Sequence, residues 1–308
     1  MEEAIKSIAN KKKILFIINP ISGVYRKEGV PEKIRQYIDY IKYDYTIRNT
    51  EYAGHATEIA KQAVAEGYQV VVAVGGDGSI NEVAQALVGT PVALGIIPYG
   101  SGNGMAGHLK IPIRNAQGAI EVLNTGKTIP IDVMTSNFRP FFSVAGFGFD
   151  AHAARRFRSQ EIRGFFSYFL AGIREIFYHF KPVAAKVKID DIVIEDEIYL
   201  FTMFNASEYG YKFGIFPNTS MRDGIMDVIV LRKFSLTRLL FIVFALMIKR
   251  PDLIKEAELF RAKKVTIFGK QKMVYQIDGD HFIYHEDLHF EVSPMALNII
   301  VPGNLNAY

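Results

Sequence analysis

Three glycine-containing turns in the first third of the chain have the composition of a phosphate-binding site. The turns are, in chain order, Asn19-Pro20-Ile21-Ser22-Gly23, Gly75-Gly76-Asp77-Gly78-Ser79 and Gly100-Ser101-Gly102-Asn103. Glycine adopts positive φ readily and lets the backbone approach a bulky anion. Helices expected to begin at Ile80 and Gly104 would add free N–H groups and the positive end of a helix dipole. We therefore expect a polyphosphate ligand.

Asp77 is the residue of these turns that is hardest to explain by structure alone. A carboxylate beside a phosphate is repelled unless a divalent metal ion or a proton-donating hydroxyl lies between them. Its position therefore indicates metal binding or proton transfer. The neighbouring Ser79 and Glu82 have the spacing of a capping box, which predicts the start of a helix.

Two better-known nucleotide motifs fit this sequence less well. A Walker A loop needs Lys followed by Ser or Thr after its last glycine, and none of the three turns has that pair. The segment Gly102–Gly107 is spelled like a dinucleotide-binding G-x-G-x-x-G. It lies far from the first strand, however, and Glu121 falls in a helical run where that motif needs an acidic residue after a strand.

A zinc-protease signature, H-E-x-x-H, is present at His285-Glu286-Asp287-Leu288-His289. That chemistry needs both histidines on one face of a helix. The flanking runs Val274–Ile277 and Phe290–Val292 are instead typical of strands around a turn, so we interpret the match as accidental.

The elements that would position the glycine turns alternate between strands and helices. Strands are expected at Ile14–Ile18, Tyr45–Arg48, Val70–Val74 and Val92–Ile97, and helices at Pro31–Lys42, Ala56–Glu66 and Ile80–Leu87. This order predicts an α/β domain with a doubly wound parallel sheet. All three turns then fall at the carboxyl edge of the sheet, where such sheets bind ligands.

The rest of the chain is rich in short strand-like runs and predicts a mainly antiparallel β-sandwich. The runs are Ile129–Met134, Phe141–Val144, Ala185–Ile189, Ile198–Phe204, Met226–Leu231, Lys264–Ile267 and Leu297–Val301. Helical insertions are expected near Arg155–His179 and Ser235–Phe260. We place the domains at residues 1–131 and 132–301, with the tail 302–308 packing back on the first.

Composition excludes several function classes. The 308 residues contain no cysteine, which excludes disulfides, Cys-ligated zinc and a thiol nucleophile and fits a reducing cytoplasm. The net charge of +4 is too small to imply nucleic-acid binding. The longest apolar run, Leu239–Ile248, is shorter than the roughly 20 residues that cross a bilayer.

In order and spacing, the three turns resemble those of the diacylglycerol kinase catalytic-domain family, which includes bacterial lipid kinases and sphingosine and ceramide kinases. The resemblance continues through Thr50, His55-Ala56, Asn205, Asp223-Gly224, Asp278-Gly279-Asp280 and Pro294-Met295-Ala296-Leu297. It implies a phosphofructokinase/NAD kinase-like first domain, because Gly-Gly-Asp-Gly is shared with those enzymes.

The resemblance implies an ATP- and Mg²⁺-dependent lipid kinase of phospholipid or sphingolipid metabolism, with a role for each matching residue. ATP would be held by Asn19, Pro20, Ser22, Gly23, Thr50, Gly75, Gly76, Asp77, Gly78, Ser79, Asn81, Glu82, Gly100, Ser101, Gly102, Asn103 and Asp280. Asp278 would accept the proton of the lipid hydroxyl, with Asp77 as its rival for that role. Ser220, Asp223 and Ile225 would hold a structural Mg²⁺. Without the resemblance, both Asp-Gly pairs are typical of ordinary turns.

Two departures from the family pattern matter. Ser101 and Asn103-Gly104 stand where kinases of diacylglycerol or phosphatidylglycerol often carry Thr and Asn-Asp, and they look closer to sphingosine and ceramide kinases. The acceptor is therefore expected to be diacylglycerol or a sphingoid base. Asp280 stands where Glu is common, so we expect its contact with nucleotide or metal to be altered.

Basic and large apolar residues alternate in segments that could touch a membrane. These are Arg155-Arg156-Phe157-Arg158, Arg163 with Phe165-Phe166, and Leu239–Ile248 with Lys249-Arg250. Such segments either lie in a membrane interface or pack on the sandwich with a solvated basic face. A lipid substrate implies peripheral membrane contact and an apolar tunnel, placed by analogy between the sandwich sheets, and the family often forms homodimers.

Two other functions would fit parts of the sequence. An NAD kinase-like phosphotransferase shares the Gly-Gly-Asp-Gly turn, but its separate downstream Asn-Glu motif is not evident here. A non-catalytic nucleotide or lipid sensor is disfavoured by the presence of both Asp77 and Asp278.

Overall fold

The computed structural model describes residues 11–20, 29–100, 102–137, 139–148, 181–206, 219–238, 241, 242, 244, 245, 248, 250–269 and 272–305. Ser22, Gly23, Ser101 and the predicted helical insertion at Arg155–His179 lie outside these residues. The chain forms two compact units, residues 1–133 with 210–212 and 294–308, and residues 134–209 with 213–293.

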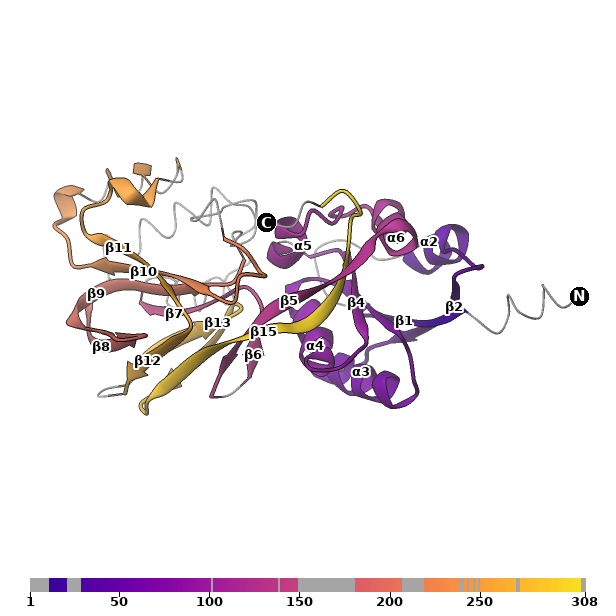
Figure 1. The fold of residues 1–308 in the computed structure, drawn as a ribbon, viewed down its shortest axis with the longest axis horizontal. Helices are drawn as coiled ribbons and strands as arrows, with labels where there is room; N and C mark the ends of the chain where they lie inside the picture. Colours follow the sequence, from indigo (N-terminus) through magenta and orange to yellow (C-terminus); the bar gives the residue numbers. More distant parts are fainter. Residues whose placement is uncertain are drawn as a thin grey trace, which may run out of the picture. The chain divides into compact units, whose positions relative to one another are not determined.

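The first unit is an α/β domain, as predicted (Figure 1). Its elements are β1 (Lys12–Ile18), α2 (Val30–Tyr37), β2 (Tyr43–Asn49), α3 (His55–Ala65), β3 (Val70–Gly75), α4 (Asp77–Leu87), β4 (Ala93–Pro98), α5 (Gly104–His108), α6 (Ala116–Thr125) and the start of β5 (Lys127–Ser136). The strands run parallel in the order β2-β1-β3-β4, followed by the end of β15 (Leu288–Val301).

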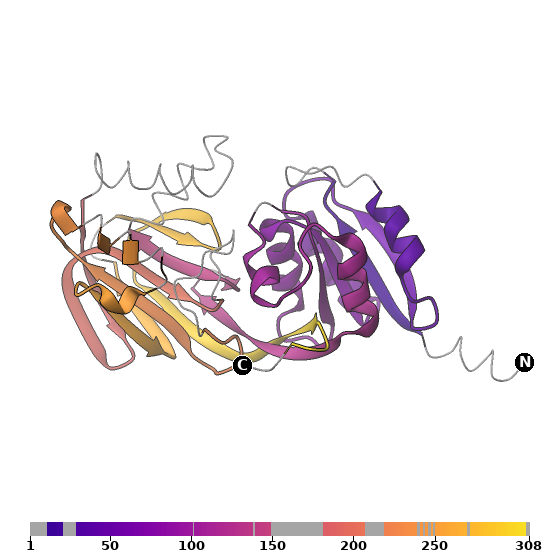
Figure 2. The same ribbon diagram turned by 90° about the horizontal axis from the view of Figure 1, so that it is seen from above.

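Helices cover both faces of this parallel sheet, so the sheet is doubly wound. Helix α3 packs against α4 on one face, and α2 packs against α6 on the other (Figures 1 and 2). Strands β3 and β4 are buried along their whole length, because a sheet covered on both faces has no solvent side. Their continuous apolar runs, Val70–Val74 and Ala93–Ile97, reflect that environment.

The second unit is antiparallel. Its remaining elements are β6 (Pro140–Phe141), β7 (Val144–Gly148), β8 (Val183–Ile189), β9 (Ile192–Phe204), β10 (Met226–Arg232), β11 (Ala257–Ala262), β12 (Lys264–Phe268), β13 (Met273–Ile277), β14 (Asp280–Tyr284) and the 3₁₀ turns η1 (Leu236–Arg238) and η2 (Pro251–Leu253). The strand order is β14-β13-β7-β9-β8-β12, with the start of β15 beside β12, and β10 pairs with both β9 and β11. The predicted sandwich class is confirmed.

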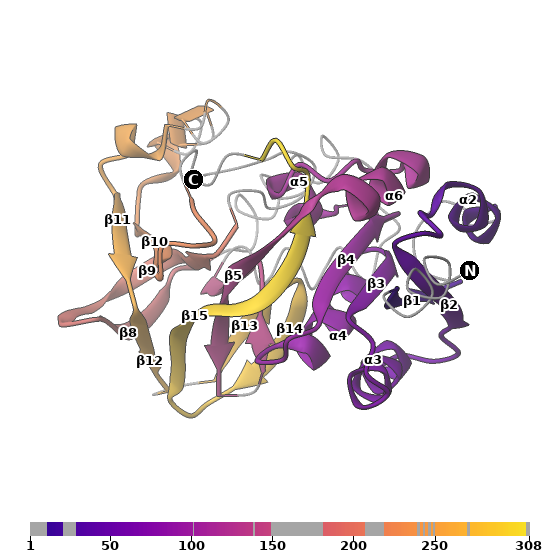
Figure 3. The same cartoon turned by 45° about the vertical axis from the view of Figure 1, so that its right-hand side comes forward.

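Two predicted boundaries differ from the structure. Residues 294–301 were predicted in the second domain but belong to the first unit, because the end of β15 pairs with β4 at Asn298 and Ile299 (Figure 3). The helical insertion predicted at Ser235–Phe260 is wrong at its end. Residues from Ala257 onward form β11, since their backbone pairs with the edge of β10.

The predicted capping box is also wrong. Helix α4 begins at Asp77 with Gly76 as its N-cap, and no side chain caps it. Ser79 therefore lies inside the first turn, three residues after the N-cap position where a capping hydroxyl would act. In the described part of the chain, no helix has both the length and the hydropathy needed to cross a membrane.

Candidate functional site

The carboxyl edge of the parallel sheet brings together most of the predicted nucleotide-binding residues that the structure describes. Asn19 follows β1, and its side-chain Nδ2 lies 3.3 Å from Oγ of Ser79. Thr50 follows β2, is buried, and donates its N–H to the carbonyl of Ile18 at 2.8 Å. Parallel pairing makes this convergence necessary, since the ends of β1, β2, β3 and β4 share one edge.

Gly76 and Gly100 make the closest approach at this edge. A Cβ atom on Gly100 would lie 2.5 Å from Cα of Gly76, and one on Gly76 would lie 3.1 Å from Cα of Gly100. A side chain at Gly100 would push the two backbones apart, and one at Gly76 would be tight. The two glycines therefore let the β3 and β4 turns pack directly against each other at this edge.

Asp77 has a structural partner that the sequence did not indicate. Its Oδ2 accepts the N–H of Asn103 at 2.7 Å, and its Oδ1 accepts the N–H of Gly104 at 2.9 Å. The carboxylate therefore caps the beginning of α5 from another loop. The expectation that Gly104 offers a free N–H to phosphate is wrong for this reason, and the first turn of α4 is the helix start left to do so.

Asn103 closes the third turn on itself. The residue is buried, has φ 56°, and exchanges two hydrogen bonds with Gly100, donating from Nδ2 at 2.6 Å and accepting at Oδ1 at 2.8 Å. Asparagine tolerates this left-handed conformation better than most residues. The side chain that the sequence suggested for ATP therefore shapes the loop.

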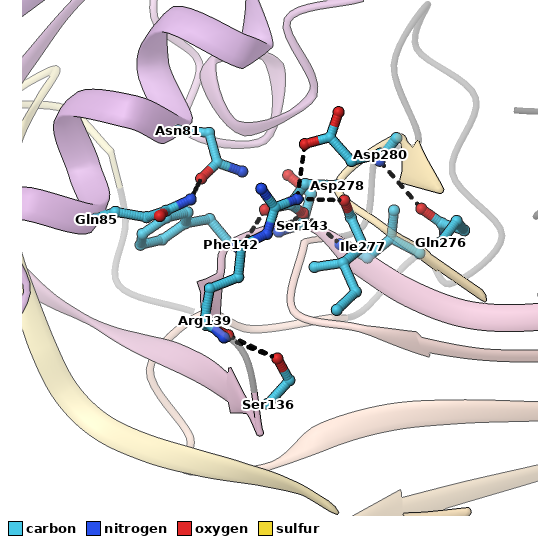
Figure 4. Close-up of polar contacts among 12 residues, drawn as sticks. Asn81, Gln85, Ser136, Arg139, Phe142, Ser143, Gln276, Ile277, Asp278 and Asp280 are labelled. Atoms are coloured by element: carbon cyan, nitrogen blue, oxygen red, sulfur yellow. Dashed lines mark hydrogen bonds and ion pairs between the residues drawn. The ribbon is translucent and has the colours of Figure 1, made fainter. Parts of the chain in front are cut away.

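In the second unit, Asp278 and Gly279 form the two-residue turn between β13 and β14. Their φ angles are 48° and 84°, the positive values that a type I′ hairpin requires. The ordinary-turn interpretation of this pair is thus correct for the backbone. The carboxylate, however, accepts the N–H of Phe142 at 2.9 Å on Oδ2, and those of Ser143 at 2.9 Å and Val144 at 3.0 Å on Oδ1 (Figure 4).

Burial and hydrogen bonding act on the Asp278 carboxyl in opposite directions. Desolvation disfavours its charged form and raises its pKa, while the three N–H groups and the nearby Arg139 act to lower it. The net direction is a raised pKa. A carboxylate held in a fixed orientation with a raised pKa is a better proton acceptor than an ordinary aspartate.

Arg139 and Asn205 support this turn, and the sequence singled out neither for that role. Arg139 Nη2 donates to the carbonyl of Ile277 at 2.9 Å and to Oδ2 of Asp280 at 2.8 Å (Figure 4). Asn205 is buried, and its Nδ2 donates to the carbonyl of Phe142 at 3.2 Å. Arg139 has no motif around it, so only the fold could reveal the contact.

The same hydrogen-bonding arrangement occurs once more in this unit, at Asp190 in the β8–β9 turn. Asp190 has φ 46°, and its Oδ1 accepts the N–H groups of Lys263 and Lys264 at 3.1 and 2.9 Å. Its own N–H donates to the carbonyl of Lys264 at 2.9 Å, just as that of Asp278 donates to Val144 at 2.8 Å. Asp190 is exposed, whereas Asp278 is partly buried. Burial therefore distinguishes Asp278 from a turn-forming aspartate.

The predicted structural metal site is a hydrogen-bonded turn. Asp223 accepts the N–H of Ile225 on Oδ1 at 3.2 Å, and its Oδ2 forms an ion pair with Arg261. Ser220 Oγ accepts the N–H of Arg222 at 3.2 Å. Among the described residues, no group of three or more His, Asp or Glu side chains is arranged to hold a metal ion. Arg261 pairs with one carboxylate oxygen of Asp223. Because the resemblance implies ligands that are partly backbone oxygens, the structural Mg²⁺ at Ser220, Asp223 and Ile225 stays a prediction.

The H-E-x-x-H sequence at residues 285–289 does not lie on a helix. His285 follows the end of β14 at Tyr284, and His289 lies in β15, where its Nδ1 is 3.1 Å from Oγ1 of Thr266. The strand-like flanks predicted from sequence are confirmed.

Comparison with known proteins supports both units. Residues 13–136 match the model of the diacylglycerol kinase catalytic domain, and residues 143–301 match that of the YegS C-terminal NAD kinase beta sandwich-like domain. A crystal structure from Bacillus anthracis str. Sterne has a TM-score of 0.80 at 21% identity, covering 96% of this chain and 97% of that one. A diacylglycerol kinase from the same strain has a TM-score of 0.72 at 20% identity, covering 96% and 98%. The class is thus a two-domain protein with a kinase-type α/β domain and a β-sandwich.

Curated relatives agree with the family that the two domain models indicate. The diacylglycerol kinase of Bacillus subtilis (strain 168) is 29% identical over 282 residues, which cover 88% of this chain and 90% of the relative. That of Staphylococcus aureus (strain bovine RF122 / ET3-1) is 28% identical over 281 residues, covering 88% and 87%. This chain belongs to the diacylglycerol kinase catalytic-domain family. Its relatives support a kinase-type phosphotransferase.

Proposed function

We propose that this protein transfers the γ-phosphate of ATP to the hydroxyl group of a lipid. The observation that carries the proposal is the Asp278 carboxylate, which three consecutive backbone N–H groups orient and burial makes more basic. The Gly76–Gly100 contact supports the nucleotide half of the proposal. It holds the β3 and β4 turns together at the edge of the sheet where α4 begins, and a helix start offers N–H groups to phosphate.

The reaction needs positioning and one proton acceptor. The lipid oxygen attacks the γ-phosphorus, its proton passes to Asp278, and the bond from phosphorus to the departing ADP oxygen breaks. Mg²⁺ bound with the nucleotide would neutralise phosphate charge. Each carboxylate oxygen can accept about two bonds, so Asp77, with one N–H on each oxygen, can still contact that ion.

Asp278 is favoured over Asp77 as the proton acceptor. Asp77 already has a structural task as the cap of α5. For Asp278, in contrast, burial works against the charged form and increases its affinity for a proton.

Diacylglycerol is the first candidate acceptor, because the curated relatives carry that name. A sphingoid base is the second candidate, because Gly104 stands where kinases of diacylglycerol or phosphatidylglycerol often carry Asp. The test combines labelled ATP and Mg²⁺ with mixed micelles of diacylglycerol, phosphatidylglycerol, sphingosine, dihydrosphingosine, ceramide or monoacylglycerol. One labelled lipid phosphate is expected. Phosphate transfer to NAD alone, or ATP binding without any turnover, would overturn the proposal.

A further inference from the structure

An exposed apolar surface lies on the second unit between β10 and β11. Five large side chains form it: Phe241 (44% exposed), Phe244 (57%), Ile248 (45%), Leu253 (41%) and Leu259 (42%). We call these residues the 241–259 surface. Large apolar side chains exposed singly are common on proteins, whereas several within 19 residues of one another indicate an interaction site.

The segment is anchored by other residues, so this surface is not needed for the core. Ile242, Ala245 and Ile254 are buried in a cluster with Ile229 and Leu231 of β10. The exposed residues follow the spacing i, i+3, i+7 at 241, 244 and 248, which places them on one helical face. The N–H of Ile248 donates to the carbonyl of Phe244 at 3.1 Å, as in a helix.

Leu259 extends the surface onto the sheet. It pairs with Ile229 across the β10–β11 ladder, and directly opposed residues in an antiparallel pair lie on the same face. Ile229 belongs to the cluster that anchors the segment. The exposed part of Leu259 therefore lies on the face that the segment covers.

The region that contains this surface carries most of the chain's net positive charge, which favours an anionic partner. Residues 232–259 contain six basic residues and three acidic residues, a net charge of +3, compared with +4 for the whole chain. The remainder of the chain thus carries +1. The basic residues are Arg232, Lys233, Arg238, Lys249, Arg250 and Lys255, and the acidic residues are Asp252, Glu256 and Glu258.

Four of these cations form ion pairs: Arg232 with Asp196 and Glu258, Lys233 with Glu197, Arg238 with Glu256, and Arg250 with Asp252. Arg238 lies 3.0 Å from Glu256, and its guanidinium carbon is 5.7 Å from the centre of the Phe241 ring. Arg250 lies 2.7 Å from Asp252, with about half of each side chain exposed. Exposed ion pairs contribute little stability, so an anionic headgroup can compete with Asp252 for Arg250. Glu256 is only 19% exposed, so its pair with Arg238 is retained. Lys255 is exposed as well.

We propose that the 241–259 surface docks the protein onto a bilayer that contains anionic lipid. The apolar side chains enter the boundary between headgroups and acyl chains, and the cations around them contact headgroup phosphates. This inference rests on the proposed function, since a kinase of lipids must reach its acceptor at a membrane. It assigns that contact to named residues.

The test compares vesicle binding by Phe244→Glu with a matched control, Ile192→Glu. Ile192 is 53% exposed in the same unit but lies in the β8–β9 hairpin. In flotation assays with phosphatidylcholine vesicles that contain phosphatidylglycerol, Phe244→Glu should weaken binding by at least about tenfold. Ile192→Glu should bind like the wild type, and added salt or omission of phosphatidylglycerol should weaken wild-type binding.

Activity assays separate this inference from the proposed function. Phe244→Glu should lose activity on vesicle-borne lipid but keep it on a water-soluble short-chain lipid, with an unchanged melting temperature. If no lipid is phosphorylated while the vesicle-binding results hold, the proposed function fails and the docking surface stands. Equal vesicle binding by Phe244→Glu and the wild type overturns the inference. So does sedimentation showing that Phe244→Glu only dissociates a dimer, because the partner would then be a second copy.

Discussion

Replacing Asp278 by Asn removes the proton acceptor and one hydrogen-bond acceptor oxygen. Asparagine has a single side-chain oxygen, while Phe142, Ser143 and Val144 present three N–H groups. The amide oxygen can serve Ser143 and Val144, which leaves the amide NH₂ facing the N–H of Phe142. An unsatisfied buried donor costs about 1–3 kcal/mol, so the free energy of unfolding should fall by that amount. Loss of a general base should reduce kcat by about 10²- to 10⁴-fold.

Asp190→Asn is the matched control for this substitution. Asp190 also has a positive φ, but its Oδ1 accepts both N–H groups, and Oδ2 adds only a longer contact of 3.3 Å to the N–H of Lys263. A single asparagine oxygen can therefore serve both N–H groups. Stability should fall by less than about 1 kcal/mol, and kcat should not change. Turnover is measured with labelled ATP at a temperature below the unfolding transitions of both variants. The ATP affinity, measured by calorimetry, should be unchanged in both. Near-normal kcat for Asp278→Asn, or an equal loss for Asp190→Asn, would refute the assignment of Asp278 as the base.

Three further outcomes are expected. Gly100→Ala places a Cβ atom 2.5 Å from Cα of Gly76, which should reduce the free energy of unfolding by about 1–3 kcal/mol. Calorimetry should also show weaker ATP binding, and an unchanged affinity would count against a nucleotide site there. Burial lowers the pKa of His108 to about 4, so the unfolded chain binds more protons between pH 6.5 and 4, and stability should fall by up to about 3 kcal/mol as pH decreases through that window. Denaturant titrations at several pH values measure this effect, and the free energy of unfolding should depend less steeply on pH in His108→Gln than in the wild type. Arg139→Gln removes a charge that lowers the pKa of Asp278, so the acidic limb of the kcat/KM profile should move to higher pH; a shift to lower pH would contradict the assigned base.

The sequence predicted the elements that depend on local pattern. Continuous apolar runs such as Val70–Val74 are typical of strands buried on both faces, and the glycines after them mark the turns, so the carboxyl-edge convergence followed from strand order. The contacts of Asp77 could not be predicted in this way. Its partners Asn103 and Gly104 are 26 and 27 residues away, and no spacing rule links two loops of different strands.

Burial was the second quantity beyond the reach of local pattern. Asp190 and Asp278 both begin two-residue hairpin turns with a positive φ, and each donates its N–H to a carbonyl of another strand. Only the fold shows that Asp190 is exposed and Asp278 partly buried. The same limit explains the error at Ala257. Its segment is apolar enough for a helix, but the open edge of β10 provides a partner that makes it a strand.

The pairing of β4 with the end of β15 has a consequence for protein synthesis. Ala93 and Leu94 pair with Asn298 and Ile299, so this edge of β4 has no partner until residues 298 and 299 have left the ribosome. Translation at about 5–20 residues per second delays that pairing by roughly ten seconds or more. An exposed strand edge can pair with other chains. Nascent chains stalled before residue 298 should therefore aggregate or recruit chaperones, and truncated forms of the first unit should do the same.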